Sequence, residues 1–302
     1  MDTNILLENG TNELEVLEFM IGDNHYGINV AKVREIIPYP EITPVPNSHP
    51  YVEGIIMPRD TMLTVVDLGK VTKAPEHNDT LMDMLIITNF NKLNIAFHVH
   101  RVCGIHRVSW ADITSPDATV SSEGYGITTG IIKLDGKLII VLDFETIVSN
   151  IAPSTGLKVH EIEKFSSRTR NDIPIYMAED SALLMKLISD SLNKSGYTNL
   201  NKSNNGQECW DKLSELARKH KDNIQEYVRC IITDIEMPMM DGHRLTKLIK
   251  TDPVLKDIPV VIFSSLISDE MRRKGEALGA DAQMSKPEIG LLVEEIDKLL
   301  LK

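Results

Sequence analysis

The hydrophobic pattern of this 302-residue chain changes its character once, near residue 173. Before that point, short apolar runs follow one another closely and are separated by Gly, Pro, Asn and Asp. After it, apolar runs of strand length alternate with segments of about 10–15 residues whose apolar positions recur at helical spacing. A chain of 302 residues also exceeds one ordinary domain of about 100–200 residues. The sequence therefore predicts two domains, at residues 1–152 and 173–302, joined by a polar linker at 153–172.

The first half is dominated by strand patterns. Runs rich in Ile, Val and Leu are expected as strands at LEVLEFMIG, HYGINV, VEGIIMP, TMLTVVDL, DMLIITN, KLNIAFHVHRV and GIIKLDGKLIIVLD. Asp135-Gly136 is typical of a hairpin turn. Helical patterns are expected only around residues 31–37 and 144–148, with one more in the linker around 157–164. Many short strands at close spacing predict an all-β barrel or a pair of barrels.

The second half alternates strands with helices. Strands are expected at IPIYMAED, VRCIITD, IPVVIFSS and AQMSK, and helices at SALLMKLISDSLNK, GQECWDKLSELARKH, GHRLTKLIK, DEMRRKGEAL and EIGLLVEEIDKLL. This alternation is typical of an α/β domain with a doubly wound parallel sheet.

The charge balance and the cysteines bound the cellular context. The chain has 32 basic and 44 acidic residues, a net charge of −12, and no block of Lys and Arg. A nucleic-acid or anionic-membrane partner is therefore disfavoured. The three cysteines lie far apart without a CxxC motif, which indicates a reduced, cytoplasmic chain. The acidic N-terminus does not look like a signal peptide, and no apolar run approaches the ~18–20 residues that insert into a bilayer.

Polar residues follow the predicted strands of the second half, and they favour phosphoryl chemistry. Glu179 and Asp180 end the first strand, Asp234 ends a buried strand, and Ser264 and Lys286 end the last two. Ligands of doubly wound sheets bind outside these carboxyl ends. Converging carboxylates repel one another unless a hard cation such as Mg²⁺ neutralises them. A lysine and a hydroxyl beside them would stabilise phosphoryl oxygens.

The order of these residues, with Asp234 inside TDIEMPMMDG and Lys286 before a proline, resembles the receiver domains of bacterial response regulators. The resemblance covers essentially all of residues 171–302 and implies a flavodoxin-like fold. It implies that Asp234 is the phosphoacceptor, a nucleophile toward a donor phosphohistidine. The roles that it implies for the other residues are metal binding by Glu179, Asp180, Asp234 and the backbone carbonyl of Glu236, switching by the Ser264 hydroxyl, and pairing of Lys286 with the phosphoryl group.

Two positions depart from the receiver pattern. Glu179 stands where Asp is commoner, and Gln283 stands where many receivers carry an aromatic switch residue. An alternative is a haloacid-dehalogenase-like phosphatase, which also pairs an Asp nucleophile with Mg²⁺. That class places its nucleophile on the first strand in DxDx[TV], whereas Asp234 lies on a later strand. A receiver-like domain that binds partners without phosphorylation is a further alternative, against which the full acidic set argues.

The first half offers no catalytic set. His98 and His100 alternate on one predicted strand and therefore face the same side, with His106 shortly after. Cys103 has the opposite parity, so the ligands of a metal site do not converge. We expect exposed strand histidines rather than a metal centre.

The same half resembles CheW-like coupling domains over roughly residues 14–150. The resemblance is carried by VAKVREII, by PEITPVPNSHPYVEGIIMPRDTMLTVVDL, by VHRVCGIHRVSW and by TGIIKLDGKLIIVLD. It implies paired five-stranded barrels without an active site, which bind the chemotaxis histidine kinase and the tips of chemoreceptors. Arg59 falls on the arginine of the family's Arg-Gly turn, with Asp60 in place of the glycine. Val33 and Glu35 fall on its early helical turn, and with Arg59 they are the implied partner contacts.

A CheW-like domain followed by a receiver resembles the CheV-type chemotaxis coupling proteins. This resemblance implies a non-enzymatic cytoplasmic scaffold at membrane-receptor signalling arrays, not inserted in the membrane. Mg²⁺-dependent phosphorylation of Asp234 by the kinase would regulate it during adaptation. The alternative is a phosphate sink, in which the first half only localises a receiver that drains phosphoryl groups from the kinase.

Overall fold

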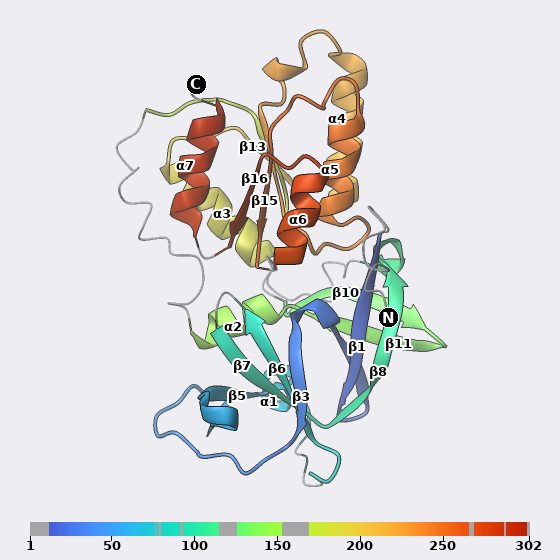
Figure 1. The fold of residues 1–302 in the computed structure, drawn as a ribbon, viewed down its shortest axis with the longest axis vertical. Coiled ribbons are helices and arrows are strands. Elements are labelled where there is room, and N and C mark those ends of the chain that lie inside the picture. Colours follow the sequence, from blue (N-terminus) through green and yellow to red (C-terminus); the bar gives the residue numbers. More distant parts are fainter. Residues whose placement is uncertain are drawn as a thin grey trace. The chain divides into compact units, whose positions relative to one another are not determined.

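The computed structural model, drawn in Figure 1, divides into two compact units, one within residues 13–152 and the other within 169–300. It describes residues 12–75, 77, 80–90, 93–114, 126–152, 169–265, 269–286 and 288–300. The helix expected around 157–164, and most of the expected linker, lie outside the described residues. Among the described residues, no helix combines the length and the apolar character needed to cross a bilayer.

The first unit contains two sheets. The first sheet has the spatial order β8 (Arg101–Ser109), β1 (Glu13–Ile21), β2 (Asn24–Asn29), β11 (Lys137–Leu142), β10 (Thr128–Leu134) and β9 (Ile113–Thr114). The second has the order β3 (Val33–Pro38), β6 (Met84–Phe90), β7 (Leu93–Val99), β5 (Leu63–Asp67) and β4 (Val52–Ile56). Neighbouring strands are antiparallel except for one parallel pair in each sheet, β2 with β11 and β5 with β7. The first sheet thus has five longer strands and the two-residue β9.

Three apolar clusters explain why the two sheets stay together. One cluster lies within the first sheet and includes Val16 and Ile139, and another lies within the second sheet and includes Val65. The third joins both sheets through residues such as Phe19 and Phe97. Each sheet therefore has a core of its own and shares a further core with its partner, as expected for paired barrels.

Two short helices and one tight turn follow the sequence signals closely. The helix expected around 144–148 is α2 (Phe144–Ile151), which Asp143 caps by accepting a hydrogen bond from the Thr146 amide. A second helix, α1 (Leu68–Thr72), follows β5 directly. Asp135 and Gly136 have φ values of 48° and 78°, as a two-residue hairpin turn between β10 and β11 requires.

The helical pattern around residues 31–37 is wrong. Only Val30–Lys32 form a short 3₁₀ turn, and the chain then enters β3 and pairs with β6. Val33 and Glu35 consequently lie on a strand rather than on a helical turn. Residues 33–37 include three β-branched side chains, which favour a strand. Pairing with β6 therefore determines their conformation, although their apolar residues recur at helical spacing.

The expectation of exposed histidines at positions 98 and 100 is also wrong. Both are only 8% exposed, and the expected single strand around them is two strands, β7 and β8, with His100 at the bend. The His98 ring lies between two carboxylates, with Nε2 2.8 Å from Asp83 and Nδ1 3.2 Å from Glu53. Nδ1 of His100 accepts a hydrogen bond from the Gly22 amide.

The second unit is a parallel five-stranded sheet with helices on both faces (Figure 1). Its strand order is β13 (Leu200–Ser203), β12 (Ile175–Ala178), β14 (Cys230–Thr233), β15 (Val260–Ser264) and β16 (Ala282–Ser285). The helices are α3 (Ala182–Lys194), α4 (Gly206–Lys219), α5 (Gly242–Thr251), α6 (Asp269–Ala277) and α7 (Ile289–Leu300). One apolar cluster packs α3 and α7 on one face, and another packs α4 and α5 on the opposite face. The doubly wound fold is therefore confirmed, while the short and polar edge strand β13 carried no clear sequence signal.

Candidate functional site

The polar residues that follow the strands of the second unit meet at one edge of its sheet. Glu179 and Asp180 follow β12, Asp234 follows β14, and Lys286 follows β16. Glu179, Asp234 and Lys286 are 2–4% exposed, and Ser264 at the end of β15 is fully buried. Asp180 is partly exposed, so the edge opens toward solvent on its side.

Three carboxylates and one lysine form the centre of this edge. One carboxylate oxygen each of Glu179, Asp180 and Asp234 lies within 4.8 Å of the other two. Nζ of Lys286 lies 2.7 Å from Asp234 Oδ2 and 3.0 Å from Glu179 Oε2. If all four groups are ionised, three negative charges and one positive charge leave a net charge of −2, which matches one divalent cation.

Backbone amides hold two of these carboxylates in place. Asp234 Oδ1 accepts a hydrogen bond of 2.6 Å from the amide of Ile235, and Glu179 Oε1 accepts one of 3.2 Å from the amide of Ser181. Asp234 therefore uses one oxygen for its own backbone and directs the other, Oδ2, toward Lys286.

Asp241 and Gly242, at the start of α5, shape the loop that follows Asp234. Asp241 caps α5, and its Oδ1 accepts a hydrogen bond from the amide of Arg244. A Cβ atom on Gly242 would lie 1.8 Å from the backbone oxygen of Asp234, so no larger residue fits without moving that backbone. Burial raises the pKa of Asp241 above its usual value, although the Arg244 amide opposes this effect.

The oxygen donors fit Mg²⁺ by their chemistry. Mg²⁺ binds through one or a few carboxylates and completes an octahedral shell with water or phosphate oxygens. Glu179, Asp180 and Asp234 supply such carboxylates, with one of them accessible to solvent. Glu236, whose backbone carbonyl was the fourth expected ligand, is buried in the loop after Asp234.

Gln283, the unusual residue on β16, is bound to the neighbouring helix α6. Its Nε2 donates a hydrogen bond of 2.7 Å to the backbone oxygen of Arg272. Its amide group packs directly over Gly275, where a Cβ atom would lie 2.3 Å from Gln283 Oε1. The Gln283 side chain is therefore hydrogen-bonded to α6 and does not project freely from β16, as an aromatic side chain at this position would.

In the first unit, two of the three expected partner contacts touch each other. Nη2 of Arg59 lies 2.8 Å from Oε1 of Glu35, and the Arg59 side chain is 83% exposed. Arg59 and Asp60 have φ values of 48° and 62°, the left-handed region that favours glycine. The backbone is thus left-handed at both positions, including Asp60, which stands in the place of the glycine. Val33 is half-buried at the start of β3.

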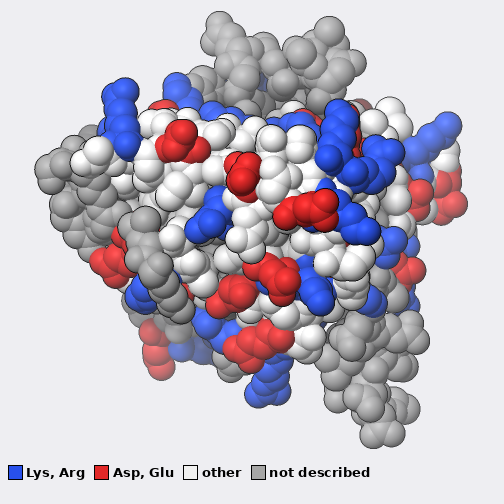
Figure 2. Space-filling view, turned by 90° about the horizontal axis from the view of Figure 1, so that it is seen from above, with Lys and Arg blue, Asp and Glu red and all other residues white. Residues whose placement is uncertain are grey.

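On the face shown in Figure 2, acidic and basic side chains are interspersed, and no continuous basic area is visible among the described residues there.

Comparisons with known proteins agree with this two-unit organisation. Residues 15–152 match the CheW-like domain, and residues 175–297 match the response regulator receiver domain. The chain is 30% identical to chemotaxis protein CheV3 of Helicobacter pylori over 304 aligned residues, which cover 96% of each chain. The chain belongs to the CheV family. A second CheV protein, CheV1 of the same organism, is 26% identical and covers 91% of this chain and 89% of its own.

The CheW half of this CheV protein also has separate relatives. Chemotaxis protein CheW of Thermotoga maritima is 32% identical over 152 residues, covering 50% of this chain and 98% of its own. The expected class is therefore confirmed: a chemotaxis scaffold protein with a receiver domain. The receiver match and the position of Asp234 directly after the third strand of its unit set aside the haloacid-dehalogenase alternative.

Two clusters in the first unit of this CheV protein have no counterpart among the expected sites. One surrounds His98, as described above. The other surrounds Glu18, a buried carboxylate in β1 that contacts His25 and His106. One sequence feature could have predicted the cluster around Glu18. Glu18 is an acidic residue on the strand face that otherwise carries the buried apolar residues Leu14 and Val16.

Proposed function

We propose that this protein couples chemoreceptors to the chemotaxis histidine kinase and that Mg²⁺-dependent phosphorylation of Asp234 adjusts the coupling during adaptation. Residues 1–152 would form the coupling domain, 153–172 the linker and 173–302 the receiver, at receptor arrays in the cytoplasm. The observation that carries the phosphorylation proposal is the buried edge where Asp234 lies beside Glu179, Asp180 and Lys286.

Asp234 is the proposed nucleophile. One of its carboxylate oxygens attacks the phosphorus of the kinase phosphohistidine, the new O–P bond forms as the N–P bond breaks, and the electron pair returns to the imidazole nitrogen. Glu179, Asp180, Asp234 and the Glu236 carbonyl would hold Mg²⁺, whose positive charge would let the anionic phosphate approach. Lys286 changes partner from a carboxylate to a phosphoryl oxygen and retains a charged hydrogen bond throughout.

Ser264 is the proposed link between phosphorylation and coupling. A phosphoryl group adds about −1.5 to −2 charges at this edge, and the Ser264 hydroxyl is drawn toward it. The adjoining α6 and β16 would then shift. Residues 266–268, which are expected to move with them, lie outside the described residues. A several-fold change in kinase output needs a difference of only ~1–3 kcal/mol between two docked states.

Arg59, Glu35 and Val33 are the proposed partner contacts of the coupling domain. The Arg59–Glu35 ion pair supports this assignment because it presents a largely exposed, oriented guanidinium on a constrained turn. Receptor tips and the regulatory domain of the kinase are the proposed partners.

The decisive experiment reconstitutes receptor, kinase and this protein and compares the wild type with Asp234→Asn. We expect Mg²⁺-dependent acyl-phosphate formation in the wild type, none in the variant, and a change in kinase activity that only the wild type shows. Phosphotransfer and hydrolysis without any change in kinase activity would instead identify a phosphate sink. Labelling of Asp234→Asn at the wild-type rate would remove Asp234 as the phosphoacceptor.

A further inference from the structure

Glu18 is an acidic residue in an apolar place. It lies on the face of β1 that also carries Leu14 and Val16, which belong to the core of the first sheet. Its side chain is only 4% exposed. A buried carboxylate is costly unless charged partners or a metal ion compensate it.

Two histidines and a lysine surround the two oxygens of Glu18. Nδ1 of His25 lies 2.5 Å from Oε1, and Nε2 of His106 lies 2.6 Å from Oε2. Nζ of Lys137 lies 3.7 Å from Oε1. Burial alone would raise the pKa of Glu18, but hydrogen bonds from His106 and His25 hold it below its usual value.

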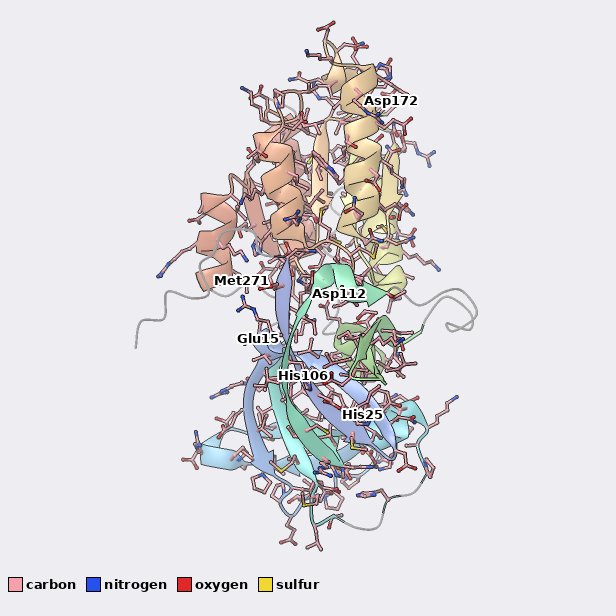
Figure 3. The ribbon with its side chains drawn as sticks, turned by 90° about the vertical axis from the view of Figure 1, so that its right-hand side faces the viewer. Glu15, His25, His106, Asp112, Asp172 and Met271 are labelled. Carbon is pink, nitrogen blue, oxygen red and sulfur yellow. The ribbon has the colours of Figure 1, made fainter. Side chains whose placement is uncertain are left out.

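The strand register explains why these side chains converge. β1 lies between β2 and β8, which carry the two histidines labelled in Figure 3. Glu18 is opposite Gly27 on β2 and opposite Gly104 on β8. The directly opposite residues have no side chain, and the diagonal neighbours His25 and His106 are the ones that reach the carboxylate.

A β-bulge adds a thiol to the cluster. The pairing of β1 with β8 shifts between Glu18 and Phe19, which leaves Cys103 as the extra residue beside Gly104. A bulge redirects a side chain that simple alternation would send to the other face. The sulfur of Cys103 accordingly lies within 4.8 Å of donor atoms of both Glu18 and His25. Cys103 is exposed, so the cluster is reachable from solvent.

An imidazole, a thiol and a carboxylate within this distance are a typical ligand set for a zinc ion. We propose that Glu18, His25 and Cys103 bind one divalent transition-metal ion, Zn²⁺ foremost, with solvent in the fourth position. His106 is a positioning residue, because it holds the second oxygen of Glu18 as outer-shell partners of metal ligands do. The ion would fasten three strands, β1, β2 and β8, at one point of the coupling domain.

The cluster around Glu18 and the receiver edge should prefer different cations. The receiver edge offers only oxygen ligands, which suit Mg²⁺, whereas the cluster around Glu18 adds nitrogen and sulfur. Excess Mg²⁺ should therefore occupy the receiver edge and leave the cluster around Glu18 available for Zn²⁺. Lys137 competes for the same Glu18 oxygen that the ion needs, so its removal should favour the ion.

The test uses the full-length, chelator-treated protein in excess Mg²⁺, titrated with Co²⁺ as a spectroscopic probe and with Zn²⁺ by calorimetry. We expect one equivalent of each ion and a thiolate-to-Co²⁺ charge-transfer band. Cys103→Ser should abolish the band, and His25→Gln should weaken Zn²⁺ binding more than His106→Gln, whose expected loss is about 10-fold or more. Lys137→Gln should bind at least as tightly as the wild type.

Two controls separate this site from other binding. Asp234→Asn should keep the charge-transfer band, because the receiver edge has no thiol, and so should a variant of a distant histidine, His49→Gln. The other two cysteines, Cys209 and Cys230, are buried in the second unit. A wild-type protein without the band, or a band and an affinity unchanged in folded Cys103→Ser and His25→Gln, would overturn the proposal. Far-ultraviolet circular dichroism establishes that each variant is folded.

Discussion

Lys286 is the residue on which the receiver edge most depends, because it is the buried cation that contacts both Glu179 and Asp234. Removing one partner of a buried ion pair leaves an uncompensated charge and typically lowers the free energy of unfolding by about 3–5 kcal/mol. The same removal makes the edge more negative. Removal of the Lys286 charge should therefore destabilise the fold but favour the binding of a metal cation.

We predict that Lys286→Met lowers the thermal stability of the receiver and that Mg²⁺ restores part of the loss, because the ion replaces the missing positive charge. Phosphorylation of Asp234 should fall at least ~10-fold, since the phosphoryl oxygens lose a donor. Thermal unfolding with and without Mg²⁺, together with a phosphotransfer assay, measures both effects. Lys298→Met is the matched control, because Lys298 forms an exposed ion pair with Glu295 and should change neither property.

His243 in α5 makes the stability of the receiver depend on pH. Burial, with a smaller effect from Lys274, lowers its pKa from 6.5 to about 4. Between these two values the unfolded chain takes up a proton that the folded chain does not, so the free energy of unfolding falls as the pH falls. At pH 5.5, one unit below the ordinary pKa, the loss is about 1.4 kcal/mol, and it grows to about 3 kcal/mol near pH 4.

We predict that His243→Gln removes this part of the pH dependence. Hydrogen exchange at β14 and β15 should show a smaller loss of protection between pH 7 and pH 5.5 in the variant than in the wild type. Amides of β6, in the other unit, serve as an internal reference and should respond equally in both proteins. Equal losses at β14 and β15 would show that His243 titrates normally in the folded chain.

At the scale of elements, α6 and β16 form the part of the receiver that we propose responds to phosphorylation. Gln283 is fastened to the Arg272 carbonyl, so β16 and α6 are already joined by a side-chain hydrogen bond. A swinging aromatic ring is absent from this position, which leaves movement of the segment after Ser264, with α6, as the proposed response.

We predict that Ser264→Ala leaves phosphorylation of Asp234 largely intact but blunts its effect on the kinase. Gln283→Ala is the comparison, and its effect on kinase output should be much smaller, because it loosens α6 without removing the hydroxyl that we propose senses the phosphoryl group. Hydrogen exchange with a stable phosphoryl mimic measures the response directly. No change in α6, β16 or the coupling domain would contradict the proposed switch.

At the scale of the whole molecule, the proposed coupling and phosphorylation sites belong to different units with separate cores. The coupling unit should therefore bind its partners without the receiver. An exposed, oriented arginine such as Arg59 is the kind of residue whose truncation at an interface often costs ~2 kcal/mol or more.

We predict that residues 1–165 alone bind kinase and receptor, and that Arg59→Ala weakens binding by roughly 30-fold, the equivalent of ~2 kcal/mol. Binding titrations with each partner measure the change. Arg107→Ala is the matched control, since Arg107 is also an exposed arginine in an ion pair, with Glu13. Unchanged affinity of Arg59→Ala for both partners would remove Arg59 from the interface.

Much of the receiver could be predicted because its signals are local. Apolar runs and amphipathic helices define a parallel sheet, and the carboxyl ends of parallel strands share one edge, so Asp234 and Lys286 come together as a consequence of topology. The edge strand β13 was not predicted, because its sequence LNKS is short and polar. Its pairing with β12 alone makes it a strand.

By itself, the sequence determined the two-domain organisation, the order of strands and helices that carry the acidic edge, and the residues gathered there. Tertiary structure alone decided which side of a strand each polar residue of the first half occupies. His98 is buried between Glu53 and Asp83, and His100 is buried at the bend between β7 and β8, where the Gly22 amide reaches it. Cys103 meets Glu18 because a bulge changes the alternation of β8. The physical reason is that alternation fixes only relative sides within one strand, whereas burial and bulges depend on partner strands that are distant in the chain.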